Sequence, residues 1–171
     1  MKLTLSTIAA IAAITLSAHA ADVKITDVHI CCKGCVTGVE EAIAKVDGVK
    51  AEADKDAHTI TLTAADTATL QKGADALIKA GYYGKSEDSN VKMHAHTGAK
   101  GEKVTSLKIE GVHLCCGKCV TAVDKALKTV DGVKEHTAVK NAKSFEVTGE
   151  FNDKEVFAAL QKAGLTGKVA N

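Results

Sequence analysis

The sequence predicts an α+β protein made of two similar units, each with the element order β-α-β-β-α-β. The first observation is a Cys-Cys-x-x-Cys motif at residues 31–35 that recurs at residues 115–119, with every cysteine shifted by 84 positions. The second is that the similarity continues beyond the motif, since Val-Asp-Gly-Val stands at both 46–49 and 130–133. A repeat of about 65 residues is longer than a solenoid repeat and long enough for a small domain.

The first 20 residues are predicted to be a secretory signal peptide and not part of the fold. Lys2 gives a positive start, an apolar stretch follows, and Ala18-His19-Ala20 has the small-x-small pattern of a cleavage site. The apolar stretch is short for a membrane span, although an uncleaved anchor is the alternative. We therefore expect a periplasmic or secreted protein with no membrane span after cleavage.

The first unit is predicted to cover residues 22–86. Val36, Val39 and Ile43 recur at helical spacing after the motif, and Gly48 suits the end of that helix. Asp66 is a suitable N-cap for a second helix. In chain order we expect a strand over 23–30, a helix from 35 to 46, strands over 49–53 and 58–63, a helix up to 79, and a strand over 82–86.

The second unit, residues 104–171, repeats this order. We expect a strand over 107–114, a helix from 119 to 130, a hairpin of 133–139 and 144–149, a helix capped by Asn152 or Asp153, and a strand over 165–169. This order is the ferredoxin-like, split βαβ arrangement, with two helices on one face of an antiparallel sheet. In both units the apolar pattern of the first strand changes phase before the motif, which predicts a β-bulge there.

Residues 87–103 are predicted to be a flexible linker, because they are polar and contain two glycines. The linker holds Met93, His94 and His96, which could assist a metal ion. A solvated linker that happens to contain them is the favoured interpretation.

The cysteines are predicted to form two soft-metal sites. Cys35 and Cys119 each open a helix, and the cysteines before them lie at its positive end, which should lower the thiol pKa values. A third cysteine precedes each pair, and a histidine stands two residues before it. Three thiolates and one imidazole make a complete tetrahedral zinc set, whereas Cu(I) accepts two or three thiolates. The candidate ligands are Cys31, Cys32, Cys35 and His29 in the first unit, and Cys115, Cys116, Cys119 and His113 in the second.

Two plainer interpretations of these residues stay open. The two histidines could be exposed strand residues, and the cysteines could be buried packing residues. The recurrence of the clustered cysteines in both units favours ligands, whereas for the histidines the two interpretations are equally supported.

Each unit resembles the heavy-metal-associated (HMA) domain, the module of copper chaperones, of the N-terminal arms of metal-pumping ATPases and of a periplasmic mercury-binding protein. The family motif Gly-Met-x-Cys-x-x-Cys aligns its two cysteines with Cys32 and Cys35, and again with Cys116 and Cys119. Its Met, a core residue, aligns with Ile30 and Leu114, whereas His29 and His113 stand in place of its Gly, and Cys31 and Cys115 at its variable position. Tyr82 or Tyr83 could be the aromatic residue that the family often places near the site, where the second unit has Leu165 and Thr166.

This resemblance implies a metal-sequestering or metal-transferring protein that is not an enzyme. The implied cargo is a soft ion, with Cu(I) or Zn(II) favoured over Hg(II) or Cd(II). The implied partners are a membrane metal transporter or another metal-binding domain.

Other function classes fit the sequence less well. The chain has no arginine, no tryptophan and a formal net charge of +1, so it lacks the basic surface of a nucleic-acid-binding protein. A thiol–disulfide redox protein is the main alternative, because secreted thiols are exposed to oxidation. The absence of proline argues against the thioredoxin fold, whose active site includes a cis-proline. A structural domain with oxidised cysteines is the third hypothesis.

Overall fold

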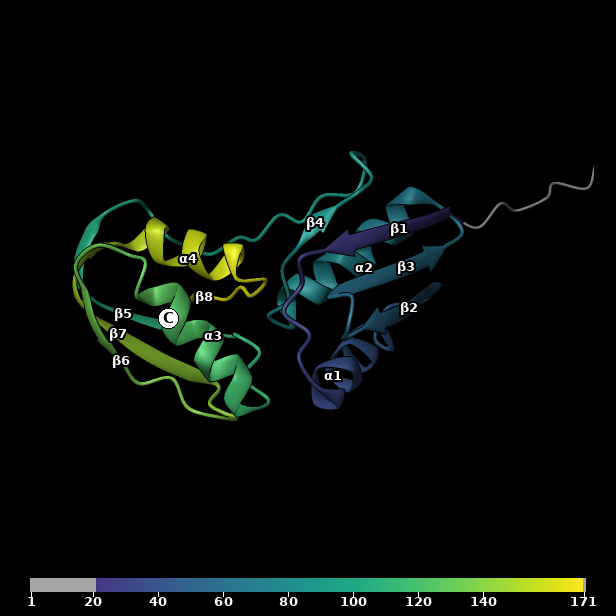
Figure 1. Ribbon diagram of the computed structural model, residues 1–171. Coiled ribbons are helices and arrows are strands. Elements are labelled where there is room, and N and C mark those ends of the chain that lie inside the picture. The colour runs from purple at the N-terminus through teal and green to yellow at the C-terminus, as the bar shows by residue number, and fades with distance from the viewer. Residues whose placement is uncertain (1–20, 171) are drawn as a thin grey trace, which may run out of the picture.

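The computed structural model describes residues 21–170, which fold into two βαββαβ units lying side by side (Figure 1). The predicted signal peptide, residues 1–20, lies outside the described residues. In the first unit the sheet order is β2-β3-β1-β4, and every pairing is antiparallel. Its elements are β1 Ala21–Thr26, α1 Lys33–Ile43, β2 Val49–Asp54, β3 Thr59–Ala64, α2 Thr67–Lys79 and β4 Lys85–Ser86.

The second unit has the same topology, with the sheet order β6-β7-β5-β8. The α+β, ferredoxin-like prediction is therefore confirmed for both units. The predicted N-caps are also observed, because Asp66 accepts a hydrogen bond from the Thr69 N–H group and Asn152 accepts one from that of Lys154. The elements are β5 Lys103–Glu110, α3 Gly117–Leu127, β6 Val133–His136, β7 Ser144–Asn152, α4 Asp153–Lys162 and β8 Lys168–Val169.

The first strand of each unit ends earlier than predicted. β1 ends at Thr26 and β5 at Glu110, and each is followed by a residue with positive φ, Asp27 at 59° and Gly111 at 79°. This left-handed residue turns the chain, so that the next apolar side chains still enter the core. The phase change therefore does not come from the expected β-bulge in the strand.

The cores lie between each sheet and its two helices. On α1 the fully buried positions are Cys35 and Val39, so the motif cysteine belongs to the core-facing side of its helix. Ile30 and Leu114, the counterparts of the family's Met, are 0% and 4% exposed. The third residue before each motif helix thus anchors the cysteine loop to the core.

The two units dock through the turns that follow α2 and α4. Tyr82 and Leu165 form an antiparallel β-bridge, with hydrogen bonds of 3.2 Å from Tyr83 N to Gly164 O and 3.0 Å from Thr166 N to Gly81 O. Because these positions correspond in the repeat, the contact is approximately twofold. It brings the two cysteine loops towards each other.

Glycine is required on both sides of this contact. A Cβ atom at Gly81 would collide with the carbonyl oxygen of Gly111 and the N–H group of His113. A Cβ atom at Gly164 would collide with the N–H group of His29 in the same way. Each of these glycines also has positive φ, 90° and 78°. Each unit therefore needs Gly after its second helix, because the backbone around His113 or His29 of the other unit packs directly against it.

The linker, residues 87–103, is held at both ends. Val91 is 1% exposed, and the Lys92 backbone exchanges two hydrogen bonds with the Gln71 side chain of α2. At the other end the carboxylate of Asp153 accepts hydrogen bonds from the N–H groups of residues 100, 101 and 102. Despite its polar sequence, the linker is fastened to both units.

None of the helices in the described part of the chain combines the length and the apolar character that a membrane crossing requires.

Candidate metal centre

All six cysteines of the chain meet at the contact between the units. Cys32 and Cys116 are the N-cap residues of α1 and α3, and Cys35 and Cys119 lie in the first turn of these helices. Cys31 and Cys115 precede the N-caps. Because the N-terminal ends of the two helices face each other, the two loops contribute to one cluster of sulfur atoms instead of two separate ones.

The sulfur atoms of the two loops are as close to each other as those within one loop. Within the units, the four short Sγ–Sγ distances lie between 3.7 and 3.8 Å. Across the contact, five pairs lie between 3.4 and 4.0 Å. These pairs are Cys31–Cys116 (3.4 Å), Cys35–Cys115 (3.4 Å), Cys32–Cys115 (3.6 Å), Cys31–Cys119 (3.8 Å) and Cys35–Cys119 (4.0 Å).

The cluster has a buried centre and a more accessible rim. Cys35 and Cys119 are 0% exposed, whereas the other four cysteines are half-buried. All six are free thiols. An ion could therefore reach the rim cysteines from solvent and be held further inside by the buried pair.

The buried pair shares a proton unequally. Hydrogen bonding by Cys119, opposed by burial and assisted by His113, holds the pKa of Cys35 far below its ordinary value. The hydrogen bond with Cys35, together with burial, raises the pKa of Cys119 far above its ordinary value. Of this pair, Cys35 is therefore the thiol that ionises more readily.

The sequence prediction of lowered thiol pKa values holds for Cys116 and is wrong for Cys31 and Cys115. For Cys116 burial alone would raise the pKa, but the backbone N–H groups of Cys119 and Lys118 and the Cys31 thiol outweigh it and lower the pKa to about 7. Burial raises the pKa of Cys31 to about 12, and it also raises that of Cys115. Closely packed thiols cannot all ionise together, which the sequence of one unit does not reveal.

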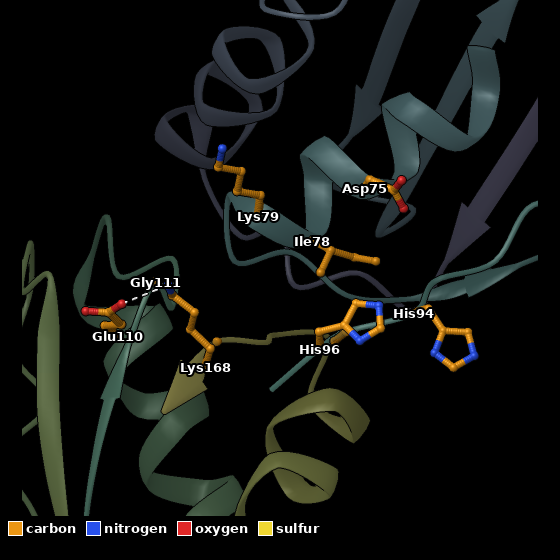
Figure 2. Close-up of a pocket in the computed structure, with 10 residues that line it drawn as sticks. Asp75, Ile78, Lys79, His94, His96, Glu110, Gly111 and Lys168 are labelled. Atoms are coloured by element: carbon orange, nitrogen blue, oxygen red, sulfur yellow. Dashed lines mark ion pairs between the residues drawn. The ribbon is translucent and has the colours of Figure 1, made fainter. Parts of the chain in front are cut away.

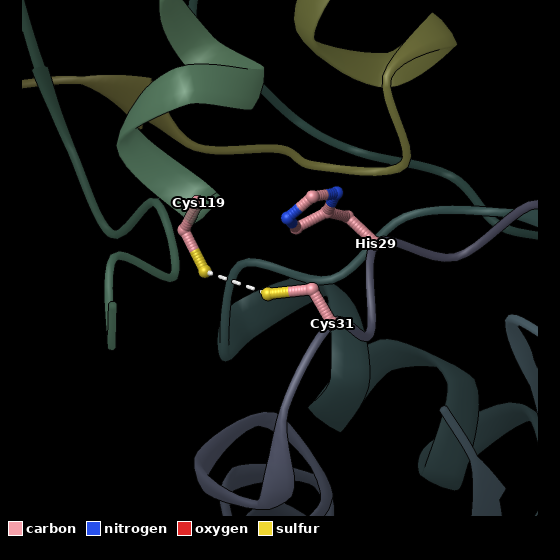
Figure 3. Close-up of side chains that lie close together, drawn as sticks. All are labelled: His29, Cys31 and Cys119. Atoms are coloured by element: carbon pink, nitrogen blue, oxygen red, sulfur yellow. Dashed lines mark hydrogen bonds between the residues drawn. The ribbon is translucent and has the colours of Figure 1, made fainter. Parts of the chain in front are cut away.

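His29 lies beside the cluster without a partner for its Nε2 atom. This atom is buried and has no hydrogen bond. His29, Cys31 and Cys119 form a group whose candidate ligand atoms all lie within 4.8 Å of one another (Figure 3). Burial lowers the pKa of His29, which favours the neutral imidazole that binds metals. The prediction placed His29 with the cysteines of its own unit, whereas this group includes Cys119 of the other.

His113 occupies the corresponding place in the repeat but has a partner. Its Nε2 atom lies 3.1 Å from the Tyr82 hydroxyl, and the two rings stack with centroids 4.6 Å apart. The Tyr82 hydroxyl also donates a hydrogen bond of 2.7 Å to the Cys35 carbonyl. Of the two tyrosines proposed from sequence, Tyr82 therefore contacts the cysteine loop directly, whereas Tyr83 lines a cleft on the His29 side.

The linker histidines lie elsewhere. His94 and His96 stack with ring centroids 6.2 Å apart and line a cavity of about 570 Å³ between α2 and the second unit, together with Asp75, Lys79 and Glu110 (Figure 2). Among the described residues, neither histidine belongs to a group close enough to hold a metal ion.

A family comparison identifies the second unit. The family model for the heavy-metal-associated domain matches residues 106–166, which include the whole second cysteine loop. The second unit is therefore a heavy-metal-associated domain. The first unit lies outside the matched residues but has the same topology and the same Cys-Cys-x-x-Cys loop. No protein of curated function matches the chain.

The chain also matches several solved structures. Oxidized MerP from Ralstonia metallidurans CH34 is 27% identical, over 41% of this chain and 100% of its own, with a TM-score of 0.36. The apo HMA domain of the copper chaperone for superoxide dismutase is 27% identical, over 52% and 86%, with a TM-score of 0.35. The N-terminal soluble domains of Bacillus subtilis CopA are 15% identical, over 90% and 95%, with a TM-score of 0.33.

Proposed function

We propose that this chain, whose second unit is a heavy-metal-associated domain, is a non-enzymatic protein that binds soft metal ions and sequesters or transfers them. The proposed ions are Cu(I), Zn(II), Hg(II) and Cd(II), because thiolates prefer soft ions. The proposed location is the periplasm or the extracellular space. A membrane metal transporter or another metal-binding domain is the proposed partner for transfer.

The observation that carries this proposal is the convergence of six free thiols from two loops. Buried packing cysteines need no sulfur neighbours, yet here five sulfur–sulfur contacts of 3.4–4.0 Å cross from one unit to the other. Such crowding is unfavourable for thiolates by themselves, because like charges close together resist ionisation. A bound cation removes this penalty, and the arrangement therefore favours a metal-loaded state.

The unequal burial of the cysteines also supports transfer by ligand exchange. An incoming ion would first meet half-buried thiols such as Cys32 and Cys116, and the buried Cys35 thiolate would then displace its carrier. Release to a partner would follow the reverse order, with the partner's thiols attacking at the rim. This step changes only the ligands and needs no oxidant or reductant.

Anaerobic titration of the reduced mature protein with Cu(I), Zn(II) and Cd(II), against a chromophoric competitor, tests the proposal. We expect stoichiometric binding of at least one of these ions, and loss of that binding when all six cysteines are changed to serine. A matched control is Val139→Ser, because Val139 is 61% exposed and remote in sequence from both loops. Absence of soft-metal binding by the reduced protein, or unchanged binding by the serine variant, would refute the proposal.

A thiol–disulfide role is the second candidate, favoured by the Cys35 thiolate lying 3.4 Å from the Cys115 thiol. In this case two thiols would form one disulfide, release two protons and pass two electrons to a disulfide or quinone oxidant. Catalytic turnover in an insulin-reduction assay would support this role, and stoichiometric metal binding without turnover would reject it.

A further inference from the structure

The six sulfur atoms form one closed polyhedron. Nine pairs lie 3.4–4.0 Å apart. Three more pairs belong to groups whose atoms all lie within 4.8 Å of one another, namely Cys31–Cys32, Cys32–Cys116 and Cys115–Cys116. With these pairs included, every sulfur has four near neighbours. Six vertices with four neighbours each have the connectivity of an octahedron.

This connectivity decides which coordination numbers the sulfurs can supply. An octahedron has triangular faces, but it has no four vertices that are all neighbours of one another. The six thiols therefore offer several three-sulfur sites. Structural Zn(II) is almost always bound by four ligands in a tetrahedron, whereas Cu(I) is satisfied by three thiolates. Three sulfurs alone therefore satisfy Cu(I), whereas Zn(II) would also need a fourth ligand such as the imidazole of His29.

The sulfur–sulfur distances argue against linear coordination. With metal–sulfur bonds of about 2.3 Å, two sulfurs are about 4.6 Å apart in linear coordination, about 4.0 Å apart in trigonal coordination and about 3.8 Å apart in tetrahedral coordination. The nine short pairs at 3.4–4.0 Å are too close for linear sites. The two-coordinate geometry that a lone Cys-x-x-Cys pair provides is thus disfavoured here.

Four triangular faces can be filled together without sharing an edge. Three of them are groups that the structure brings within 4.8 Å, and the fourth has edges of 3.7, 3.8 and 4.0 Å. Each cysteine belongs to two of the four faces, so that every sulfur would bridge two ions. The faces are Cys31–Cys32–Cys116, Cys32–Cys35–Cys115, Cys115–Cys116–Cys119 and Cys31–Cys35–Cys119.

We propose that the two units together bind four Cu(I) ions as a single thiolate-bridged cluster, with three sulfurs on each ion. This inference rests on the proposed soft-metal function and adds, for Cu(I), the number of ions and the sharing of the site between the units. Four Cu(I) charges and six thiolate charges leave a net charge of −2, and the protons of the bound thiols are released to solvent. No electrons are transferred.

The surroundings of the cluster favour this negative charge. The N-terminal ends of α1 and α3, each a helix of 11 residues, meet at the sulfurs, and neither N-cap has a side-chain hydrogen bond. Free N–H groups and the positive helix ends stabilise an anion at this position. Because ions share sulfurs, the first ion draws the two loops together and prepares the remaining faces. Loading is therefore cooperative.

The test is an anaerobic titration of the mature protein with a Cu(I)–acetonitrile complex, followed by native mass spectrometry and X-ray absorption at the copper edge. We expect the metal-free and four-copper forms to dominate throughout, with three sulfur neighbours and a nearby copper neighbour in the absorption spectrum. Saturation at one or two ions, or absence of copper–copper scattering, would overturn the inference while leaving soft-metal binding intact. Failure to bind any soft metal would instead refute the proposed function.

Matched variants separate one shared cluster from two independent sites. Cys32→Ser and Cys116→Ser each remove a half-buried sulfur that belongs to two faces, one variant in each unit. A shared cluster predicts that either variant lowers the saturating number below four and abolishes cooperative loading, with equal severity. If each variant removes only the ion of its own unit, the cluster is refuted. Val139→Ser is the surface control, and circular dichroism reports whether each variant is folded.

Discussion

The two sides of the sulfur cluster, one at His113 and one at His29, have different surroundings although the two units have the same cysteine motif. On the His113 side, the imidazole is stacked on Tyr82 and hydrogen-bonded to its hydroxyl, over Gly38 of α1. A Cβ atom at Gly38 would collide with that hydroxyl and lie 2.8 Å from the His113 ring. On the His29 side, the corresponding residues are Leu165 and Ala122.

This difference gives two equivalent histidines different chemical roles. Leu165 offers no polar atom in its side chain, so His29 keeps a buried Nε2 atom without a partner beside two sulfurs. His113 instead has Tyr82 as a partner and assists the ionisation of Cys35. We infer that His29 is available as a ligand and that His113 is a positioning residue. The thiols are the same in both units. Gly38 and Tyr82 in the first unit correspond to Ala122 and Leu165 in the second, and this difference gives the two imidazoles different surroundings.

The largest expected effect comes from separating the two sides with Gly81→Ala. The new methyl group would meet backbone atoms of the other unit, at a φ of 90°. Strain of about 1–2 kcal/mol and overpacking of about 1–3 kcal/mol should together lower the free energy of unfolding by about 2–5 kcal/mol. Denaturant unfolding and the copper stoichiometry measure the result, and we expect the shared site to be lost.

Gly111→Ala is the control for this experiment. Gly111 also has a positive φ of 79°, but a Cβ atom there would have no neighbour within 4 Å. It should therefore cost only the strain of about 1–2 kcal/mol and leave the metal stoichiometry unchanged. Equal losses in the two variants would show that the docking contact is not the cause.

The histidines are compared directly by His29→Ala and His113→Ala. Removal of the ligand should weaken Co(II) or Zn(II) binding by about 100-fold or more, whereas removal of the positioning residue should weaken it by about 10-fold. The absorption bands of Co(II) report the ligand set, so we expect them to shift in the His29 variant and to stay in place in the His113 variant. Identical spectra and affinities in both variants would remove the distinction between the two sides.

Much of this site could be predicted from one unit of the sequence, but its sharing could not. The helical spacing after residues 35 and 119 and the N-cap residues Asp66 and Asn152 act locally, and the structure agrees with them. The position of His29 near cysteines was also expected. However, its nearest group includes Cys119 of the other unit. This placement depends on how the two turns dock through Gly81 and Gly164, which the sequence of one unit does not reveal.

The pKa values and the strand ends were missed for related reasons. Proximity of six thiols is a property of the assembled pair of units, so local helix-dipole reasoning gave the wrong direction for Cys31 and Cys115. The change of phase before each motif depends on single left-handed residues, Asp27 and Gly111. Gly111 is a visible signal for such a turn in the sequence, whereas aspartate at the matching position is a much weaker one.

A smaller effect is expected from Tyr82→Phe, which makes the His113 side resemble the other. The variant keeps the ring stack but loses the hydrogen bonds to the Cys35 carbonyl and to His113. We expect a loss of about 1–3 kcal/mol in the free energy of unfolding, because a buried acceptor loses its donor. The released His113 should then alter the Co(II) spectrum.

Tyr83→Phe is the matched control, since it removes a hydroxyl from the neighbouring tyrosine, which is half-buried and lies on the His29 side of the cluster. It should change neither the stability nor the spectrum. A Tyr82→Phe protein with an unaltered spectrum would mean that the tyrosine hydroxyl does not determine the role of His113.

The smallest effect concerns the linker, which is attached to the two units through different kinds of side chain. The first unit holds it through Gln71, which is neutral at every pH, and the second through the ionised Asp153. Burial alone would raise the pKa of Asp153, but three backbone N–H groups outweigh it and lower the pKa below its ordinary value. Acid should therefore loosen only the attachment to the second unit.

The sign follows from the lowered pKa in the folded state. Asp153 contributes stability above the pKa of an unfolded aspartate, about 3.9, and this contribution disappears as the pH falls through the lower folded pKa. Asp153→Asn replaces one acceptor oxygen by an amide donor facing the Lys100 N–H group. We expect it to lower the free energy of unfolding by about 0.5–1.5 kcal/mol at neutral pH and by less in acid, where the native carboxyl is itself protonated. The control Gln71→Ala should show a loss that does not depend on pH. Denaturant unfolding of both variants at pH values on either side of the transition measures this contrast, and a pH-independent loss for Asp153→Asn would show that charge plays no part in holding the linker to the second unit.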